Sequence, residues 1–140
     1  FGLLSPNERP VIVFSPNRRH NEERAFSERS FMNQIVYNIT YAISAEVRDQ
    51  WLQWMLEVQM PRVLQTGLFL SARLMRVHAF EKDALTYSVQ YLAESSAKYE
   101  EFQKKHASVI EGAQKSNFGD AITPFATVLE VLDSTTFAPH

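Results

Sequence analysis

The sequence predicts an α+β fold in the order strand, helix, strand, strand, helix, strand. Apolar and polar residues alternate in four runs, which indicates strands, and apolar residues recur every three to four positions in two other runs, which indicates helices. Neither pattern is found before residue 32. The predicted domain therefore spans residues 32–134, with a loose tail at 135–140.

The first half of the domain is expected to form a strand, a helix and a short second helix. The strand covers residues 34–43, where alternate side chains form one strongly apolar face: Ile35, Tyr37, Ile39, Tyr41 and Ile43. Ser44 is a candidate N-cap for the helix, whose apolar residues recur at helical spacing: Val47, Trp51, Trp54, Met55 and Val58. Pro61 should break or restart this helix before a short segment at 62–66, and Gly67 should end it.

The second half is expected to form a hairpin, a long helix and a final strand. The second strand covers residues 68–80. Alternate side chains share one of its faces: Phe69, Ser71, Arg73, Met75 and Val77. A polar turn at 81–84 leads to the third strand at 85–93, and Ser95 or Ser96 can cap the helix that follows. Its apolar stripe is Tyr99, Phe102, His106, Val109, Ile110 and Ala113. Asn117 and Gly119 mark its end, and the last strand covers 122–133.

Two split strand–helix–strand units predict a ferredoxin-like βαββαβ sandwich. Right-handed crossovers place the first and third strands at the centre of a four-stranded antiparallel sheet, with both helices on one face. We expect the tyrosine-rich side of these strands to lie under the helices. The opposite side, called the open face below, has no helix to cover it.

Composition excludes several classes of function. A net charge of −2 argues against nucleic-acid binding, which needs a basic surface. The chain has no cysteine, so disulfides, thiolate catalysis and iron–sulfur clusters are excluded. We expect no membrane span, because no apolar run is long enough, and no cofactor, because no phosphate-binding glycine loop or helical pair of metal ligands occurs. The expected location is the cytoplasm.

Residues 1–31 differ in kind from the rest of the chain. Their basic residues are all arginine, and three prolines interrupt a polar segment without a regular period. The first methionine is Met32, where a complete strand-forming sequence begins. We expect residues 1–31 to be a disordered arm or translated upstream sequence. An arm that docks on a partner is the alternative.

The open face carries enough apolar surface to predict a partner. Phe69, Met75, Val77, Phe125, Leu129 and Val131 are all assigned to it by strand alternation. Soluble monomers avoid large apolar patches, so we expect a homodimer that pairs sheet against sheet. Such a dimer could enclose a small pocket with a polar centre, whose candidate lining is Asn38, Thr40, Ser71, Arg73, Ser88, Gln90, Phe125 and Thr127.

A few residues admit a functional interpretation beside an ordinary one. Arg73 could bind a ligand carboxylate through two parallel hydrogen bonds, or it could pair with the partner subunit or lie in solvent at the rim. Trp51 is a further candidate for the pocket wall, but core packing is the simpler role for it and for Trp54. His78, near Glu81 and Asp83, could bind a metal, but a surface histidine beside a polar turn is the simpler interpretation. His106 lies in an apolar stripe and could bind haem, but a partly buried or interface histidine is the simpler interpretation.

Three stretches resemble a known family. They are MNQIVYNITYAISAEVRDQWLQWM, then MPRVL-TG-F-SAR-MRV, then TYSVQYLA. They look like a family of short bacterial proteins known only as a domain of unknown function, which is similar in fold to the dimeric α/β-barrel superfamily. The resemblance covers about Met32 to Val131 and implies ferredoxin-like units paired through their sheets. That superfamily includes cofactor-independent monooxygenases, isomerases and haem-degrading enzymes, and no motif in this chain selects one of them.

Three hypotheses for function follow. The first is a homodimer that binds a small molecule between its sheets. The second is a cofactor-independent monooxygenase-like enzyme for an aromatic or anionic substrate, in which Trp51, Asn38 and Arg73 position the reacting molecule. The third is a structural interaction module whose open face is entirely protein interface. The enzyme hypothesis requires Asn38 and Arg73 to converge in a closed pocket.

Overall fold

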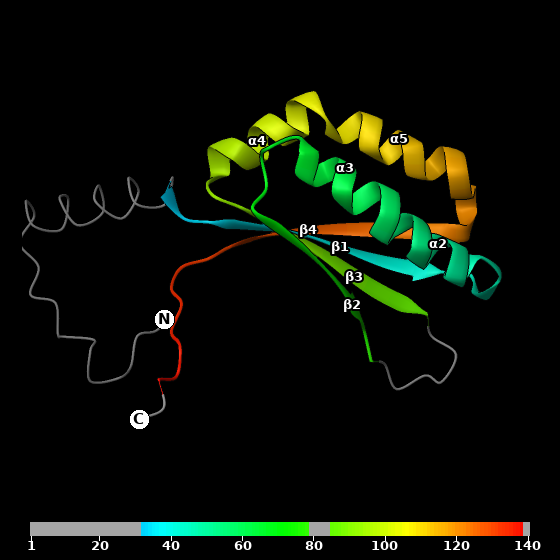
Figure 1. The fold of residues 1–140 in the computed structure, drawn as a ribbon, viewed down its shortest axis with the longest axis horizontal. Helices are drawn as coiled ribbons and strands as arrows, with labels where there is room; N and C mark the ends of the chain where they lie inside the picture. Colours follow the sequence, from blue (N-terminus) through cyan, green and yellow to red (C-terminus); the bar gives the residue numbers. More distant parts are fainter. Residues whose placement is uncertain (1–31, 79–84, 139–140) are drawn as a thin grey trace, which may run out of the picture. The chain divides into compact units, whose positions relative to one another are not determined.

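The computed structural model describes residues 32–78 and 85–138 (Figure 1). Its strands are β1 (Ile35–Ile43), β2 (Ser71–Arg76), β3 (Thr86–Ala93) and β4 (Ile122–Glu130). Its helices are α2 (Arg48–Trp54), α3 (Met60–Gln65), α4 (Ser96–Lys105) and α5 (Ala107–Phe118), with shorter helical turns η2 (Ala45–Val47), η3 (Met55–Gln59) and η4 (Gly119–Ala121). The strands form one antiparallel sheet in the order β2-β3-β1-β4. The fold is therefore a ferredoxin-like α+β sandwich, and β1 and β3 are its central strands as predicted.

The helices lie on one face of the sheet (Figure 1). The pairing register of the strands shows which side chains the helices cover, because directly paired residues point to the same side of the sheet. Tyr37 pairs with Tyr91 and Tyr41 pairs with Tyr87, and all four tyrosines are buried. Trp51 of α2 is fully buried against them, with its ring 4.9 Å from that of Tyr41. The prediction that the tyrosines face the helices is confirmed.

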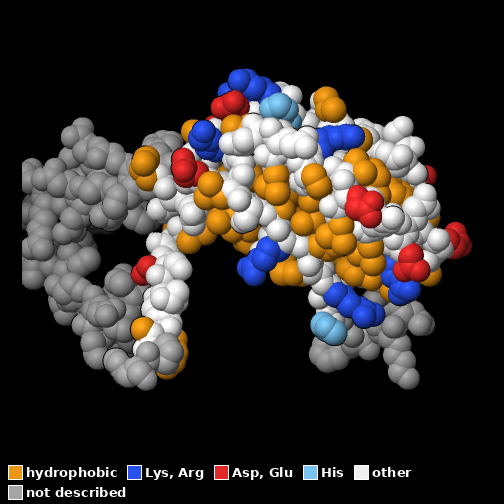
Figure 2. All heavy atoms as spheres, in the orientation of Figure 1, with side chains coloured by type: hydrophobic (Ala, Val, Ile, Leu, Met, Phe, Trp, Pro, Cys, Tyr) orange, Lys and Arg blue, Asp and Glu red, His pale blue; other side chains and the backbone are white. Residues whose placement is uncertain are grey.

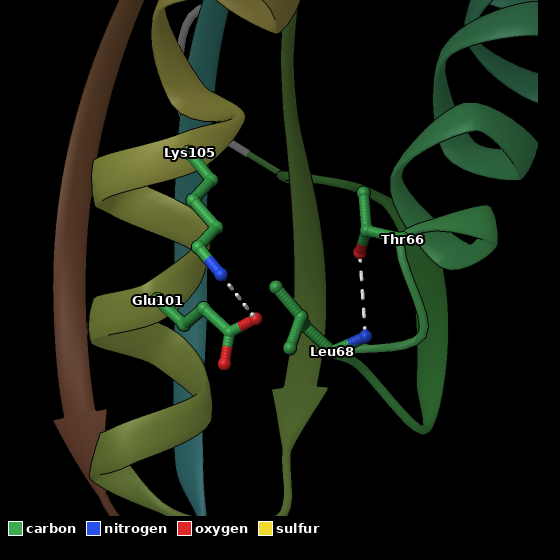
Figure 3. Close-up of polar contacts among 4 residues, drawn as sticks. All are labelled: Thr66, Leu68, Glu101 and Lys105. Atoms are coloured by element: carbon green, nitrogen blue, oxygen red, sulfur yellow. Dashed lines mark hydrogen bonds and ion pairs between the residues drawn. The ribbon is translucent and has the colours of Figure 1, made fainter.

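β2 is shorter than the predicted strand at 68–80. Gly67 has a φ of 77°, and the Thr66 hydroxyl accepts a hydrogen bond of 3.3 Å from the Leu68 backbone N–H, so a turn precedes the strand (Figure 3). Phe69 therefore lies in the core, where its ring stacks on Tyr37. Its assignment to the open face was wrong, because strand alternation starts only at Ser71. The predicted hairpin at 81–84 lies outside the described residues.

The first helical segment runs without interruption from Arg48 to Gln65 as α2, η3 and α3. Ser44 precedes it in extended conformation, but its side chain makes no capping hydrogen bond. Pro61 does not separate two helices. It occupies the first turn of α3, and the turn before it, η3, is a π-helix, in which the Met60 N–H bonds to the Met55 carbonyl. This wider turn accommodates a residue that lacks an N–H.

The second helical segment is divided where one helix was predicted. His106 leaves helical geometry, with φ −127° and ψ −27°, and separates α4 from α5. Ser95 caps α4 as predicted, since its hydroxyl accepts from the Lys98 N–H at 3.4 Å. Glu101 and Lys105 form an ion pair of 3.3 Å on the outer surface of α4 (Figure 3).

The break at His106 changes which side of the second segment is buried. Val109, assigned to the apolar stripe, is 66% exposed, so that assignment was wrong. Ala107, Ile110 and Gln114 face the core in α5 instead. His106 is partly buried, with its ring 6.1 Å from Phe102.

β4 is an edge strand that pairs only with β1. It ends at Glu130, three residues before the predicted end at 133. Pro124 is tolerated here because an edge strand has one side without ladder hydrogen bonds. Most β4 residues are exposed, including Pro124 and Ala126, which point to the helical side. The helices therefore leave this margin of the sheet uncovered.

Candidate functional site

A cavity of about 590 Å³ lies between the helical layer and the sheet. Every side chain that the central strands contribute to it belongs to the helix-covered face, namely Tyr37, Ile39 and Tyr41 from β1 and Tyr91 from β3. The helices close the opposite side with Val63, Phe102, Ala107 and Ile110. Four aromatic rings therefore line a volume in the range of small-molecule sites.

Local sequence pattern places these walls. Residues 37, 39 and 41 share one face because side chains alternate along a strand. Phe102 extends from α4 toward the sheet, with its ring centroid 6.0 Å from that of Tyr37 and 4.9 Å from that of Phe69. The break at His106 then turns Ala107 and Ile110 toward the same space.

Two buried glutamines supply the polar groups of the cavity wall. Gln59 ends the π-helical turn η3 and is 2% exposed, and Gln114 lies in α5 and is 8% exposed. The Gln59 amide donates a hydrogen bond of 3.2 Å to the Ile110 carbonyl. Among the described residues, the carbonyl oxygens of Gln59 and Gln114 have no hydrogen-bond partner. Buried polar atoms without a partner are uncommon and costly.

The π-helical turn explains how Gln59 becomes buried. Trp51, Met55, Gln59 and Val63 are all buried at intervals of four residues. In a straight α-helix, four residues make one full turn plus about 40° around the axis. After three such intervals Val63 would point away from the side on which Trp51 is buried. A π-turn has more residues per turn and rotates the stripe back. Turns of this kind often occur at functional sites.

The cavity opens between α5 and β4. Glu111 and Lys115 of α5 and Asp120 of η4 line it and are exposed, as are Pro124 and Ala126 on the facing strand. These three charged side chains are the only ones among the described lining residues. The interior is therefore uncharged and its mouth carries charges of both signs.

The tyrosines of the cavity stay neutral at ordinary pH. Burial raises the pKa of Tyr41 well above its usual value, and it raises the pKa of Tyr91 as well. Burial also raises the pKa of Tyr37, although a hydrogen bond with Gln103 acts in the opposite direction. The walls consequently offer hydroxyl groups and amide carbonyls rather than ions. This chemistry suits binding of an uncharged molecule.

The eight sheet residues of the predicted pocket do lie together on the open face. The antiparallel register puts Arg73, Gln90, Asn38 and Thr127 in one row across the sheet, and Ser88, Thr40 and Phe125 in the next row, beside Met75. Ser71 lies in a third row with Leu92. Ser88 donates a hydrogen bond to the Asn38 side-chain oxygen, and the Asn38 amide donates to Thr40 at 3.4 Å. None of these eight residues lines the cavity.

Trp51 is separated from that set by the sheet itself. It is fully buried on the helix-covered side, whereas Asn38 and Arg73 belong to the open face. Asn38 is engaged by Ser88 and Thr40, and Arg73 is exposed on the strand beyond β3. Within one chain, the residues of the enzyme hypothesis therefore share no site.

The structure describes two of the histidines, His78 and His106. His78 is exposed, and Glu81 and Asp83 lie outside the described residues. In the described part of the chain, no three His, Asp or Glu side chains are grouped so that they could hold a metal ion. His106 packs against Phe102, as the simpler interpretation of that residue expected. Trp54 lies at the margin of the core, 5.3 Å from the ring of Phe118.

Sequence reasoning missed the two cavity glutamines. A signal for Gln59 was present, because it continues the four-residue series of Trp51 and Met55 to Val63. A search for apolar stripes passes over a polar residue in such a position. Gln114 follows Ile110 by one helical turn and shares its side of α5, but the predicted stripe, which included Val109 and Ile110, ended at Ala113.

Comparison with known proteins places the chain in a family. The sequence profile of the family described as Domain of unknown function (DUF4286) matches residues 34–132. The chain belongs to the DUF4286 family. The match begins one residue before β1 and ends two residues after β4, so the whole sandwich is the DUF4286 domain. No curated protein matches the chain.

Solved structures share the fold of this DUF4286 domain. An EthD-like protein from Ralstonia eutropha JMP134 superposes with a TM-score of 0.56 at 16% identity, over 76% of this chain and 98% of that one. A protein of unknown function from Nitrosomonas europaea has a TM-score of 0.53 at 13% identity, over 78% and 99%. A dimeric ferredoxin-like protein from an uncultured marine organism has a TM-score of 0.48 at 10% identity, over 74% and 99%. The first two likenesses are at the level of fold.

The helices of residues 32–78 and 85–138 do not meet the requirements of a bilayer span. None of them has both the length and the apolar character that a membrane span requires.

Proposed function

We propose that this protein binds a small, mainly apolar molecule in the cavity between its helices and its sheet. The observation that carries the proposal is an aromatic-walled space of about 590 Å³, lined in part by two buried glutamines whose carbonyl oxygens have no hydrogen-bond partner among the described residues. Ligand sites typically combine apolar walls with a few fixed polar groups.

The charges around the cavity support entry of an uncharged ligand between α5 and β4. Glu111, Lys115 and Asp120 are exposed at this mouth, where water can solvate them. The described interior has no charged side chain to neutralise an ion. A charged ligand would lose its hydration without compensation.

A pair of tryptophan substitutions tests the location. Ala126 lines the cavity at its mouth, and Ala42 is exposed on the open face at the end of β1. A thermal-shift screen of small aromatic compounds should find ligands that raise the melting temperature of the wild type by mass action. We expect Ala126→Trp to abolish these shifts and Ala42→Trp to retain them.

The opposite result would assign the ligand to the alternative site between two sheets. That alternative is favoured by the polar rows around Asn38 and Gln90, which would lie at the centre of a paired open face. Retention of the shift in Ala126→Trp, with loss in Ala42→Trp, would contradict the cavity proposal. A screen in which no compound shifts the wild type would contradict ligand binding altogether.

We also propose that the chain pairs with a second copy through the open face. Phe125 is 70% exposed and Leu129 is 45% exposed on this side of β4. Arg73 is the only charged side chain among the described strand positions of the open face. A two-fold axis would bring two such weakly charged apolar surfaces together, and sheets pack well face to face.

Substitution of an exposed apolar residue tests the dimer. Phe125→Glu would place a carboxylate in the paired surface without disturbing the core of one chain, so size-exclusion chromatography with light scattering should report a monomer. The matched control is Val109→Glu, because Val109 is equally exposed on α5 at the far side of the sandwich. A wild-type monomer at micromolar concentration would overturn the dimer and favour an interaction module for another protein.

A further inference from the structure

We infer that the cavity selects a neutral aromatic molecule that donates hydrogen bonds, and that the carbonyl oxygens of Gln59 and Gln114 accept them. This inference rests on the proposed function and specifies its ligand class. Neither Gln59 nor Gln114 belongs to the candidate pocket that the sequence predicts.

A hydrogen bond fixes the orientation of the Gln59 amide. Its nitrogen donates to the Ile110 carbonyl at 3.2 Å, which fixes the side of the amide that faces α5. The oxygen is then left as a free acceptor in a residue that is only 2% exposed.

The two glutamines line the same cavity from different helical segments. Ile110, which holds the Gln59 amide, and Gln114 lie one helical turn apart on the buried side of α5. The two glutamines therefore belong to the same part of the cavity wall.

The two glutamine carbonyls require a ligand that donates hydrogen bonds. Each carbonyl is an acceptor, and a buried acceptor without a partner destabilises the protein unless a donor satisfies it. The matching ligand groups are hydroxyl or N–H groups. A carboxylate or phenolate would instead bring negative charge toward the two carbonyls and past Glu111 and Asp120 at the mouth. Among the described lining residues, only Lys115 carries a positive charge that opposes it.

The cavity walls are mainly aromatic. The rings of Tyr37, Tyr41, Tyr91 and Phe102 border the cavity and are all buried. Aromatic rings favour stacked or edge-to-face contact with another ring. A planar aromatic ring with hydroxyl groups thus satisfies the apolar walls and the two acceptors together.

A matched ligand series tests this inference on the wild-type protein. Phenol and benzene-1,3-diol donate hydrogen bonds, whereas anisole and 1,3-dimethoxybenzene have the same rings without a donor, and toluene has no polar group. We expect dissociation constants, measured by calorimetry, to be at least about tenfold lower for the diol than for its dimethyl ether, because the ether leaves both acceptors unpaired. Phenol should lie between the diol and toluene.

Substitution of the acceptors provides the second measurement. Methionine resembles glutamine in length and favours helices, so Gln59→Met combined with Gln114→Met should fold and should remove the preference for the diol. Toluene should bind this variant at least as well as it binds the wild type. Gln53→Met is the matched control, because Gln53 is exposed on α2, and it should leave the whole series unchanged.

The outcomes separate this inference from the proposed function. Equal binding of the diol and its dimethyl ether to the wild type would overturn the donor requirement while leaving ligand binding intact. A preference for the diol that survives in the double variant would overturn the role of the two glutamines. Failure of every compound to bind, toluene included, would remove the cavity as a ligand site and this inference with it.

Discussion

Phe102 connects the two layers of the molecule at the scale of a single residue. It is 1% exposed, and its ring lies within 6.1 Å of those of Tyr37, Phe69 and His106. It also borders the cavity. The side chain thus stabilises the packing of α4 on the sheet and shapes the space beside it.

Phe102→Ala should lower the free energy of unfolding by about 3–5 kcal/mol, because a buried ring is lost and the cavity beside it can only enlarge. Urea denaturation monitored by circular dichroism measures the change. Val109→Ala on the exposed side of α5 is the control and should change stability by no more than about 0.5 kcal/mol. Similar effects of the two substitutions would contradict the placement of Phe102 in the core.

At the scale of elements, two glycines illustrate opposite backbone requirements. Gly67 has a φ of 77° in the turn that leads from α3 to β2, a conformation that other residues adopt at a cost. Gly112 lies within α5, where glycine is less favourable than alanine. An added Cβ would meet no atom within 4 Å at either position, so packing does not obscure the comparison.

Alanine at these two positions should therefore have effects of opposite sign. Gly67→Ala should destabilise the protein by about 1–2 kcal/mol through backbone strain. Gly112→Ala should stabilise the protein by about 1 kcal/mol, because alanine loses less backbone entropy than glycine when the helix forms. The midpoints of thermal unfolding of the two variants measure both effects. If Gly67→Ala is as stable as the wild type, the left-handed turn before β2 is not required.

The buried tyrosines make the stability of the whole molecule depend on pH. Burial raises the pKa values of Tyr41 and Tyr91 above the ordinary value of 10.0, so the folded protein holds these protons more tightly than the unfolded chain. This contribution to stability is fully present below pH 10. It decreases as the pH rises from there toward the raised folded pKa values, because only the unfolded chain then releases the protons.

Unfolding in urea should accordingly become easier between pH 9 and pH 11. Tyr91→Phe should reduce this dependence, by up to about 1.4 kcal/mol per pH unit above the unfolded pKa, because one such proton is removed. Denaturation curves of the wild type and the variant at both pH values measure the difference. Identical pH dependence in the two proteins would show that Tyr91 ionises equally in both states.

The fold was predictable because its signals are local and repeated. Strand alternation in β1 and β3 and helical spacing around Trp51 and Phe102 defined the element order, and crossover handedness then gave the sheet order. Where a single residue interrupts a pattern, prediction failed. Phe69 left the predicted strand face after the turn at Gly67, and Val109 left the predicted stripe after the break at His106.

The sequence by itself determined the βαββαβ order, the tyrosine-rich covered face and the open face, because each depends on periodicity within one segment. The cavity was decided only by the tertiary structure, since its walls come from three strands and two helical segments that meet after folding. Likewise, the bond from Gln59 to the Ile110 carbonyl joins residues 51 positions apart. No periodicity within one segment encodes such a contact, because it depends on how the segments pack against one another.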